Sequence, residues 1–225
     1  MMRKINIAID GPAGAGKSTI AKALAKSRSM VYVDTGAMYR AIGLYCTRNG
    51  IAGDDEAAII GALDNINVSL GYENGEQVVY LNGENVNGFI RTPEAGVMAS
   101  AVSVYSKVRE KMVELQQALA EKTSVVMDGR DIGTVVLPKA EVKIYLTASS
   151  VVRAKRRYDE LVAKGMECDL VQLQKEIEER DYRDMNREVS PLKKAEDAVE
   201  LDTSDLSIEE VVEAMQRIVA EKIGE

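Results

Sequence analysis

Histidine is absent from all 225 residues of the chain. Without an imidazole, the protein cannot use a histidine base, a serine–histidine pair or a zinc–histidine site. Cysteine is scarce as well. Cys46 and Cys168 lie far apart without metal-ligand spacing, so we expect two reduced thiols with no assigned chemistry.

Long apolar runs are missing too. No stretch approaches the roughly 20 residues that a membrane span requires, and the N-terminus lacks the apolar core of a signal peptide, so we expect a cytoplasmic protein without membrane contact. The net charge of −7 argues against a broad nucleic-acid surface. An anionic small-molecule substrate must therefore be met by a local cluster of arginines.

Five short apolar runs alternate with helical stretches, at residues 3–9, 30–34, 124–128, 142–146 and 198–202. Short β-branched runs alternating with helices predict an α/β fold, here with a central five-stranded parallel sheet flanked by helices. Most of these runs end in or beside an aspartate. In open α/β sheets, the carboxyl ends of the strands form the edge where ligands bind.

Residues 66–87 break this alternation. Asn-Gly pairs at 74–75 and 82–83 are each flanked by residues of alternating character, which is a strong hairpin signal. The segment predicts a small antiparallel subdomain inserted into the α/β body. The expected division is a single domain over 1–225, with a core of 1–63 and 96–225 and an insertion at about 64–95.

The stretch GPAGAGKS, from Gly11 to Ser18, matches G-x-x-x-x-G-K-[ST] between a predicted strand and a predicted helix over 17–27. Its glycines let successive backbone N–H groups converge on an anion, and the helix N-terminus favours negative charge. Lys17 would reach the β and γ phosphates, and the Ser18 hydroxyl would ligate Mg²⁺. A purely structural glycine turn fits this context poorly, so we predict a P-loop NTPase fold.

Arginine placement bears on where the phosphate goes. Neither the N-K-x-D stretch of guanine-specific switches nor the serine-glycine-glycine signature of transporter ATPases occurs, which favours a small-molecule kinase. Taken as a helix, residues 169–191 place three apolar and three charged side chains within one arc: Leu170, Leu173, Ile177, Arg180, Asp184 and Arg187. Buried charges need partners, so this face should border an anion-binding cleft. If the helix bends or ends near 183, these residues are surface ion pairs instead.

A second basic run, residues 151–161, places Arg153, Arg156 and Arg157 on a helix. It is either a solvated helix face or part of a mobile flap, about 151–168, whose cations close over a triphosphate. Phosphoryl transfer needs alignment and charge neutralisation more than proton abstraction. A phosphate monoester with its second ionisation near pH 6 is already a nucleophile, which favours a nucleoside monophosphate as acceptor.

Five stretches together resemble the bacterial cytidylate kinases: IAIDGPAGAGKST, VDTGAMYRA, MDGRDIGTVVLP, RAKRRYDEL and RDYRDMNREVSPL. The likeness covers almost the whole chain in the same order. It implies transfer of a phosphoryl group from ATP to CMP or dCMP with Mg²⁺, giving ADP with CDP or dCDP. It also leads us to expect a monomer.

The resemblance implies roles for individual residues. Catalysis falls to Lys17, Arg130 and Arg180. Mg²⁺ ligation falls to Ser18. The residues assigned to ATP are Gly11, Pro12, Ala13, Gly14, Ala15, Gly16, Lys17, Ser18, Thr19, Arg153 and Arg157. Those assigned to CMP are Thr35, Arg40, Ser100, Arg109, Arg130, Asp131, Arg180, Asp184 and Arg187.

Within the CMP set, Thr35, Ser100, Arg109 and Asp131 match positions around the cytosine ring, and Arg40 and Arg130 match a clamp on the acceptor phosphate. Arg180 and Asp184 match positions near the ribose and phosphates, and Arg187 one beside the base. Thr35 stands where some relatives carry serine, which adds a methyl group.

Several alternatives stay open at this point. Ser100 also suits a plain helix face, and Asp131 could cap the turn after its strand. Asp128 could order the water shell of Mg²⁺ or simply hold the local backbone. The acceptor could be UMP, AMP or another small alcohol or phosphate, and a different class of protein, an ATP-dependent switch, would need no arginine-rich acceptor cleft.

Overall fold

A computed structural model describes residues 4–73 and 76–225. The chain divides into two compact units, which are described separately. The first, here called the sheet unit, comprises residues 1–32 and 122–225. The second, called the inserted unit, comprises residues 33–121. Within the described residues, no helix is both long and apolar enough to cross a bilayer.

The central sheet has five strands in the order β2-β6-β1-β7-β8. They are β1 (Asn6–Asp10), β2 (Val31–Asp34), β6 (Val125–Gly129), β7 (Val142–Thr147) and β8 (Val199–Asp202). Strand β1 pairs in parallel with both β6 and β7. In this register, Ile7 lies opposite Val126 of β6 and Val142 of β7. All five predicted strands are confirmed.

Because β1 lies between β6 and β7, the chain leaves it towards one side of the sheet and later returns on the other. Such a switch in direction opens a crevice at the carboxyl ends of the strands. The last residue of β1 is Asp10, and Gly11 follows directly. The glycine-rich stretch therefore begins at this crevice.

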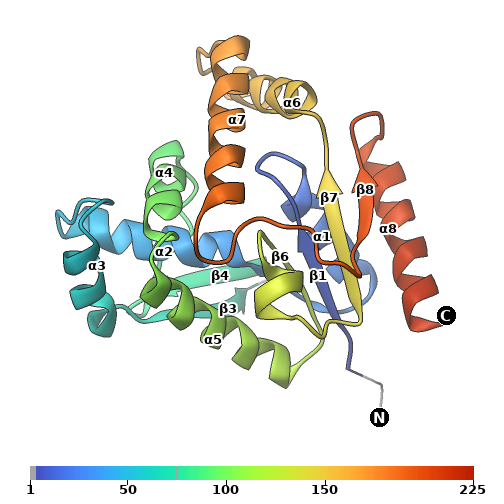
Figure 1. Ribbon diagram of the computed structural model, residues 1–225, viewed down its shortest axis with the longest axis horizontal. Helices are drawn as coiled ribbons and strands as arrows, with labels where there is room; N and C mark the ends of the chain where they lie inside the picture. Colours follow the sequence, from blue (N-terminus) through green and yellow to red (C-terminus); the bar gives the residue numbers. More distant parts are fainter. Residues whose placement is uncertain (1–3, 74–75) are drawn as a thin grey trace. The chain divides into compact units, whose positions relative to one another are not determined.

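Four helices accompany the strands of the sheet unit: α1 (Lys17–Ser27), α6 (Ser150–Ala163), α7 (Leu170–Asn186) and α8 (Ile208–Ile223). Helix α1 has the bounds expected from the sequence. Its Ile20 and Leu24 pack into one apolar cluster with Ile7, Ile144 and Met215, which joins the sheet to α1 and α8 (Figure 1). Burial of this cluster is the main term that stabilises the unit.

The inserted unit holds a second sheet, of three antiparallel strands: β3 (Val68–Glu73), β4 (Glu76–Leu81) and β5 (Glu84–Asn85). The predicted turn at Asn82-Gly83 joins β4 to β5, with φ of 50° and 85° as a two-residue hairpin of this kind requires. The other predicted Asn-Gly turn, at 74–75, lies outside the described residues. The small antiparallel sheet is thus confirmed.

Helices make up the rest of the inserted unit (Figure 1). They are α2 (Thr35–Arg48), α3 (Glu56–Ala62), a short 3₁₀ helix (Leu63–Asn65), α4 (Pro93–Val102) and α5 (Ser106–Lys122). Helices α2 and α4 pack closely, and the Cβ of an alanine at Gly43 would lie 2.9 Å from the Met98 side chain. The compact unit therefore reaches well beyond the residues of the small sheet.

Candidate active site

The glycine-rich stretch 11–19 leaves the carboxyl end of β1 and runs into α1. Gly11, Gly14 and Gly16 have φ of 151°, 76° and 84°, in the region that favours glycine. The stretch ends at Lys17, the first residue of α1, whose side chain is buried and whose Nζ donates to the Pro12 carbonyl over 2.7 Å. This loop, with its lysine folded back against it, has the form of a phosphate cradle.

Lys17 lies in a cationic environment. Burial, and then the positive charge of Arg130, lower the pKa of its ammonium well below the ordinary value. Arg180 lowers it further, and the carboxylates of Asp128 and Asp10 oppose the change. A phosphate bound beside Lys17 would act in the opposite sense, because a nearby negative charge favours the charged ammonium.

Asp128 lies beside the phosphate loop. It lies in β6, and its Oδ2 accepts a hydrogen bond from the Ser18 hydroxyl over 2.9 Å. Its Oδ1 accepts another from the Tyr32 hydroxyl over 2.8 Å. The serine hydroxyl and the carboxylate are hard oxygen donors of the kind that Mg²⁺ prefers, so this pair fits a magnesium site. Both side-chain oxygens of Asp128 thus accept hydrogen bonds from side-chain hydroxyls, one of them in the phosphate loop.

Asp10 links the loop to the segment that carries Arg130 and Asp131. Its two carboxylate oxygens accept from the backbone N–H groups of Ile132 and Gly133, each over 2.7 Å. These N–H groups begin a five-residue π-helical turn, Ile132–Val136, directly after Asp131. Burial raises the pKa of Asp10 to about 6, although both backbone bonds oppose the change. The aspartate before Gly11 thereby fixes the backbone that follows β6.

Arg130 and Asp184 form an ion pair, with Nε 2.9 Å from Oδ2. Burial alone would raise the pKa of Asp184, but Arg130, Arg180 and Arg187 outweigh it and hold the pKa below its usual range. Both Asp184 and Arg180 lie on α7, on the same side as the buried Ile177. The predicted change of that helix face from apolar to charged is therefore present from Ile177 onward, whereas Leu170, expected on the inward stripe, is exposed at the start of the helix.

Helix α7 ends at Asn186, so Arg187 lies just beyond it with an extended backbone. The end lies between the two expectations, a helix through residue 191 and a helix that ends near residue 183. Its end does not remove Arg187 from the cluster, because its NH2 lies 3.8 Å from Asp131 Oδ1 and both side chains are buried. Asp131 thus lies beside Arg187, as Asp184 lies beside Arg130.

The basic run on α6 separates into two environments. Arg153 is buried and donates to the carbonyls of Ala148 and Ala13, the latter in the phosphate loop. Arg157 lies on the exposed face and pairs with Glu160 over 2.9 Å. The structure brings Arg153 to the loop and does not bring Arg157 there.

In the inserted unit, Asp34 forms ion pairs with two arginines. Its Oδ2 lies 3.1 Å from Arg40 NH2 and 2.9 Å from Arg91 NH1, while Oδ1 caps α2 by accepting from the Ala37 N–H. Burial would raise the pKa of Asp34, but Arg40 and Arg91 together hold it below the ordinary value. Gln77 completes the cluster by accepting from the Asp34 N–H over 2.8 Å.

A second set of predicted residues meets around Ser103 in the inserted unit. Arg109 is buried, lies over the Tyr39 ring at 5.4 Å and donates to the Ser103 carbonyl over 3.1 Å. The Ser103 hydroxyl in turn donates to the Ser100 carbonyl over 3.0 Å. Thr35 is buried at the first position of α2. Ser100 and Arg109 are therefore both linked to Ser103 within this unit.

Sequence reasoning missed several residues that the structure joins to the predicted ones: Asp10, Tyr32, Asp34, Arg91 and Asp181. Asp10 and Asp34 carried a usable signal, since each is an aspartate at the end of a predicted strand. Asp181 lies four residues after Ile177, on the expected inward stripe. Tyr32 and Arg91 gave no signal, because their partners lie far away in the sequence.

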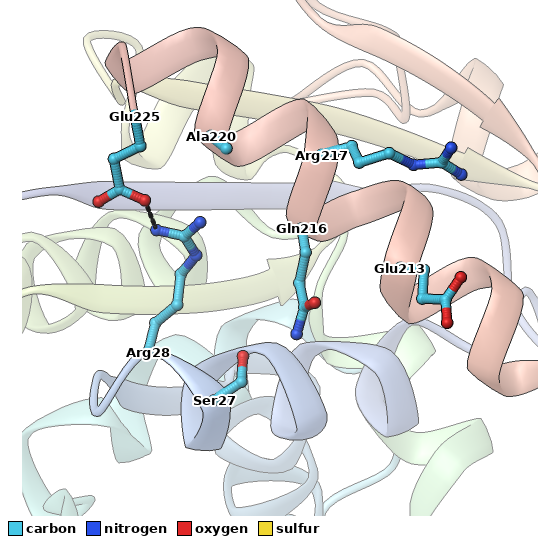
Figure 2. Close-up of a pocket in the computed structure, with 7 residues that line it drawn as sticks. All are labelled: Ser27, Arg28, Glu213, Gln216, Arg217, Ala220 and Glu225. Atoms are coloured by element: carbon cyan, nitrogen blue, oxygen red, sulfur yellow. Dashed lines mark hydrogen bonds and ion pairs between the residues drawn. The ribbon is translucent and has the colours of Figure 1, made fainter.

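A pocket of about 740 Å³ lies elsewhere in the sheet unit, between the C-terminal end of α1 and helix α8 (Figure 2). An exposed ion pair between Arg28 and Glu225, 3.0 Å long, borders it. Since the phosphate loop adjoins the N-terminal end of α1, this pocket lies away from Lys17 and Ser18. It shares no residue with the cluster described above.

Comparison with known proteins finds related sequences over almost the whole chain. The sequence model of the family described as Cytidylate kinase matches residues 7–221. A cytidylate kinase of Geobacillus sp. (strain WCH70) is 54% identical over 224 residues, covering 100% of both chains. A cytidylate kinase of Caldicellulosiruptor saccharolyticus is 52% identical over 223 residues, covering 99% of both.

Among solved structures, an uncharacterised protein from Eubacterium ventriosum superposes with a TM-score of 0.52. The two chains are 12% identical, and the match covers 96% of this chain and 98% of the other. At that identity the likeness concerns the fold alone.

Proposed function

Because the chain belongs to the cytidylate kinase family, we propose that it transfers the γ-phosphoryl group of ATP to CMP and dCMP. The products are ADP with CDP or dCDP. The observation that carries the proposal is the glycine-rich loop that ends at the buried Lys17, with the positive charges of Arg130 and Arg180 close enough to lower the pKa of its ammonium. Membership of the family makes the chain a phosphotransferase. ATP as the donor and CMP or dCMP as the acceptor are the proposed part.

The reaction needs no residue to remove a proton. An oxygen of the acceptor's phosphate, already ionised near neutral pH, attacks the γ-phosphorus of ATP, and the bond from that phosphorus to the β–γ bridging oxygen breaks. The chain has no histidine, which accords with such a mechanism. Lys17, Arg130 and Arg180 would neutralise the negative charge on the phosphate oxygens while one bond to the γ-phosphorus forms and the other breaks.

We propose that residues 11–19 bind the triphosphate through their backbone N–H groups. Arg153 supports this function from behind the loop, since its NH1 donates to the Ala13 carbonyl over 2.9 Å. Arg157 pairs with Glu160 in this structure, so a role in ATP binding would require that exposed pair to open. A movement of the flap at 151–168 would supply the opening.

Mg²⁺ would be held by Ser18, with Asp128 beside it, and would supply charge neutralisation between the β and γ phosphates. The hydroxyl and the carboxylate are already within 2.9 Å of each other. The protein contributes few ligands here, as is usual for a magnesium ion that arrives with a nucleotide. Ser18 is the proposed ligand, and Asp128 orients the water around it.

For the acceptor, we propose that Arg40, Arg130 and Arg180 meet the phosphate and that Asp184 contacts the ribose. Asp131 would accept from the exocyclic amine of cytosine, which uracil lacks. The remaining residues proposed for the base are Thr35, Ser100, Arg109 and Arg187. The burial of Asp131 and Arg109 supports this assignment, because hydrogen bonds to a base edge are stronger where water is excluded.

The test is release of ADP from Mg-ATP with CMP, dCMP, UMP, AMP, GMP and dTMP as acceptors. CMP and dCMP should give the highest kcat/KM, and omission of any acceptor should reduce ADP release to a small background. A higher kcat/KM for UMP or AMP would reassign the acceptor. ADP release at the same rate without acceptor would instead favour an ATP-dependent switch.

A further inference from the structure

Tyr32 lies in β2 and is 8% exposed. Its ring belongs to the apolar cluster formed with Leu24 and Val126, and the Lys22 ammonium lies 5.8 Å from the ring centroid. A phenylalanine would fill this space equally well. The hydroxyl must therefore be explained by something other than packing, because burying it costs free energy unless it is paired.

The partner of this hydroxyl is Asp128. Tyr32 donates to Asp128 Oδ1 over 2.8 Å, while the other oxygen, Oδ2, accepts from the Ser18 hydroxyl over 2.9 Å. The carboxylate is 5% exposed. One oxygen thus points to the core and the other to the phosphate loop, so the two bonds together fix the plane of the carboxylate.

We propose that Tyr32 is a positioning residue for the magnesium-nucleotide: by holding Asp128 Oδ1, it keeps Oδ2 directed at Ser18, where the metal would bind. The inference rests on the proposed function of that site. It adds a residue outside the phosphate loop and outside the predicted CMP set.

The Asp128 carboxylate needs such a partner because it can rotate about the last bond of its side chain. Rotation about the terminal bond of an aspartate is broad, so a carboxylate held at one oxygen only can turn. If the Ser18 hydroxyl turned towards a magnesium ion, Asp128 would lose its bond at Oδ2 and would retain the one from Tyr32. Oδ2 would then be presented to the water shell of the metal in a defined direction, which is how an outer hydrogen bond tunes a metal site.

The test uses Tyr32→Phe, which removes one oxygen atom and keeps the ring. Affinity for ATP is measured by calorimetry in the presence of Mg²⁺ and again in the presence of EDTA. We expect affinity for Mg-ATP to fall roughly tenfold. Affinity for metal-free ATP and KM for CMP should stay unchanged, and the Mg²⁺ concentration that gives half-maximal rate should rise.

Tyr80→Phe is the matched control. The Tyr80 hydroxyl also donates to a carboxylate, that of Glu73 over 2.6 Å, but on the exposed surface of the small sheet. This variant should match the wild type in both affinities. A drop in melting temperature in Tyr32→Phe with an unchanged ratio of the two affinities would overturn the proposal, since it would assign the hydroxyl to stability alone.

A double-mutant cycle with Asp128→Asn completes the experiment. If Tyr32 acts through Asp128, the Tyr32→Phe change should have little further effect on Mg-ATP affinity in the Asp128→Asn background. Equal losses in both backgrounds would overturn the proposal. Because these readouts concern nucleotide binding only, they stay decisive even if the acceptor screen were to reject CMP.

Discussion

Arg153 and Asp181 form a buried ion pair, with Arg153 NH2 2.6 Å from Asp181 Oδ2. The two residues lie on α6 and α7, and each is less than a tenth exposed. The same guanidinium donates to the Ala13 carbonyl in the phosphate loop. The Arg153 side chain of α6 therefore connects the phosphate loop with α7. Helix α7 also carries Arg180 and Asp184.

Removing the acid from this pair should weaken both the fold and nucleotide binding. In Asp181→Ala, the Arg153 charge stays buried without its counter-ion, and the expected loss of unfolding free energy is about 3 kcal/mol. Urea denaturation measures this loss, and calorimetry with ATP measures the accompanying fall in affinity. Glu160→Gln breaks the exposed pairs with Arg157 and Lys164 and should cost less than about 1 kcal/mol. Equal costs in the two variants would contradict the structural role of Arg153.

Features set by residues near one another in the chain could be predicted from the sequence. The alternation of apolar runs with helical stretches gave the five strands of the sheet. The motif before Lys17 marked the start of α1 at its observed residue. Asn82-Gly83 marked a hairpin, because few other dipeptides tolerate two consecutive positive φ angles.

Features that depend on strand order could not be predicted in the same way. The π-helical turn Ile132–Val136 depends on the Asp10 carboxylate, 122 residues earlier in the chain. The bond from Tyr32 to Asp128 likewise spans 96 residues and requires β2 to lie beside β6. The end of α7 before Arg187 was missed because the chain turns back there, and Leu192 N–H donates to the Asp184 carbonyl.

Lys17→Ala should abolish transfer while leaving the fold intact. The side chain supplies a charge to the phosphates rather than to the core, and loss of one such donor to a developing charge lowers kcat on the order of a thousandfold. Rate measurements and a thermal melt test both parts of the expectation. Lys175→Ala, on the exposed face of α7, is the control and should leave kcat unchanged. A Lys17→Ala protein that keeps more than about a tenth of the wild-type rate would contradict the assignment.

Asp131→Ala should lose far more activity towards CMP than affinity for ATP. The proposed carboxylate partner of the cytosine amine disappears, and Arg187 loses the acid that lies 3.8 Å away. The kcat/KM for CMP should fall by at least roughly a hundredfold, since a base edge would be left without its partner. In Asp131→Asn, the ratio of kcat/KM for CMP to kcat/KM for UMP should fall. If ATP affinity and CMP use fell together, the residue would not belong to the base pocket.

Gly11→Ala should prevent normal folding. The added Cβ would lie 1.9 Å from the Leu146 carbonyl oxygen, far inside van der Waals contact, at a φ of 151° that alanine rarely adopts. Gly16 has a comparable positive φ of 84° but open space around it. Gly16→Ala should therefore cost only the backbone strain, about 1–2 kcal/mol. Soluble yield and urea denaturation distinguish the two, and similar stability in both variants would show that β7 can yield at Leu146.

The pH dependence of stability should carry a contribution from Asp10. Burial raises the pKa of this carboxyl from 3.8 to about 6 in the folded protein. A raised pKa means that the fold favours the protonated form, so the stabilising contribution is complete below about pH 4 and is lost as the pH rises through about 6. Relative to Asp10→Asn, the unfolding free energy of the wild type should fall by about 2 kcal/mol between about pH 4.5 and about pH 7.5.

The comparison with Asp10→Asn cancels the titration of every other group, provided that both proteins unfold in one step. Asp197→Asn serves as the control, because hydrogen bonding from Lys143 holds the pKa of Asp197 below its ordinary value. Its contribution changes only at lower pH, so the difference from the wild type should be flat over the same interval. A flat difference for Asp10→Asn as well would mean that the two backbone N–H bonds from Ile132 and Gly133 outweigh burial and keep Asp10 ionised. The turn that carries Arg130 and Asp131 would then be held by a full negative charge throughout this pH interval.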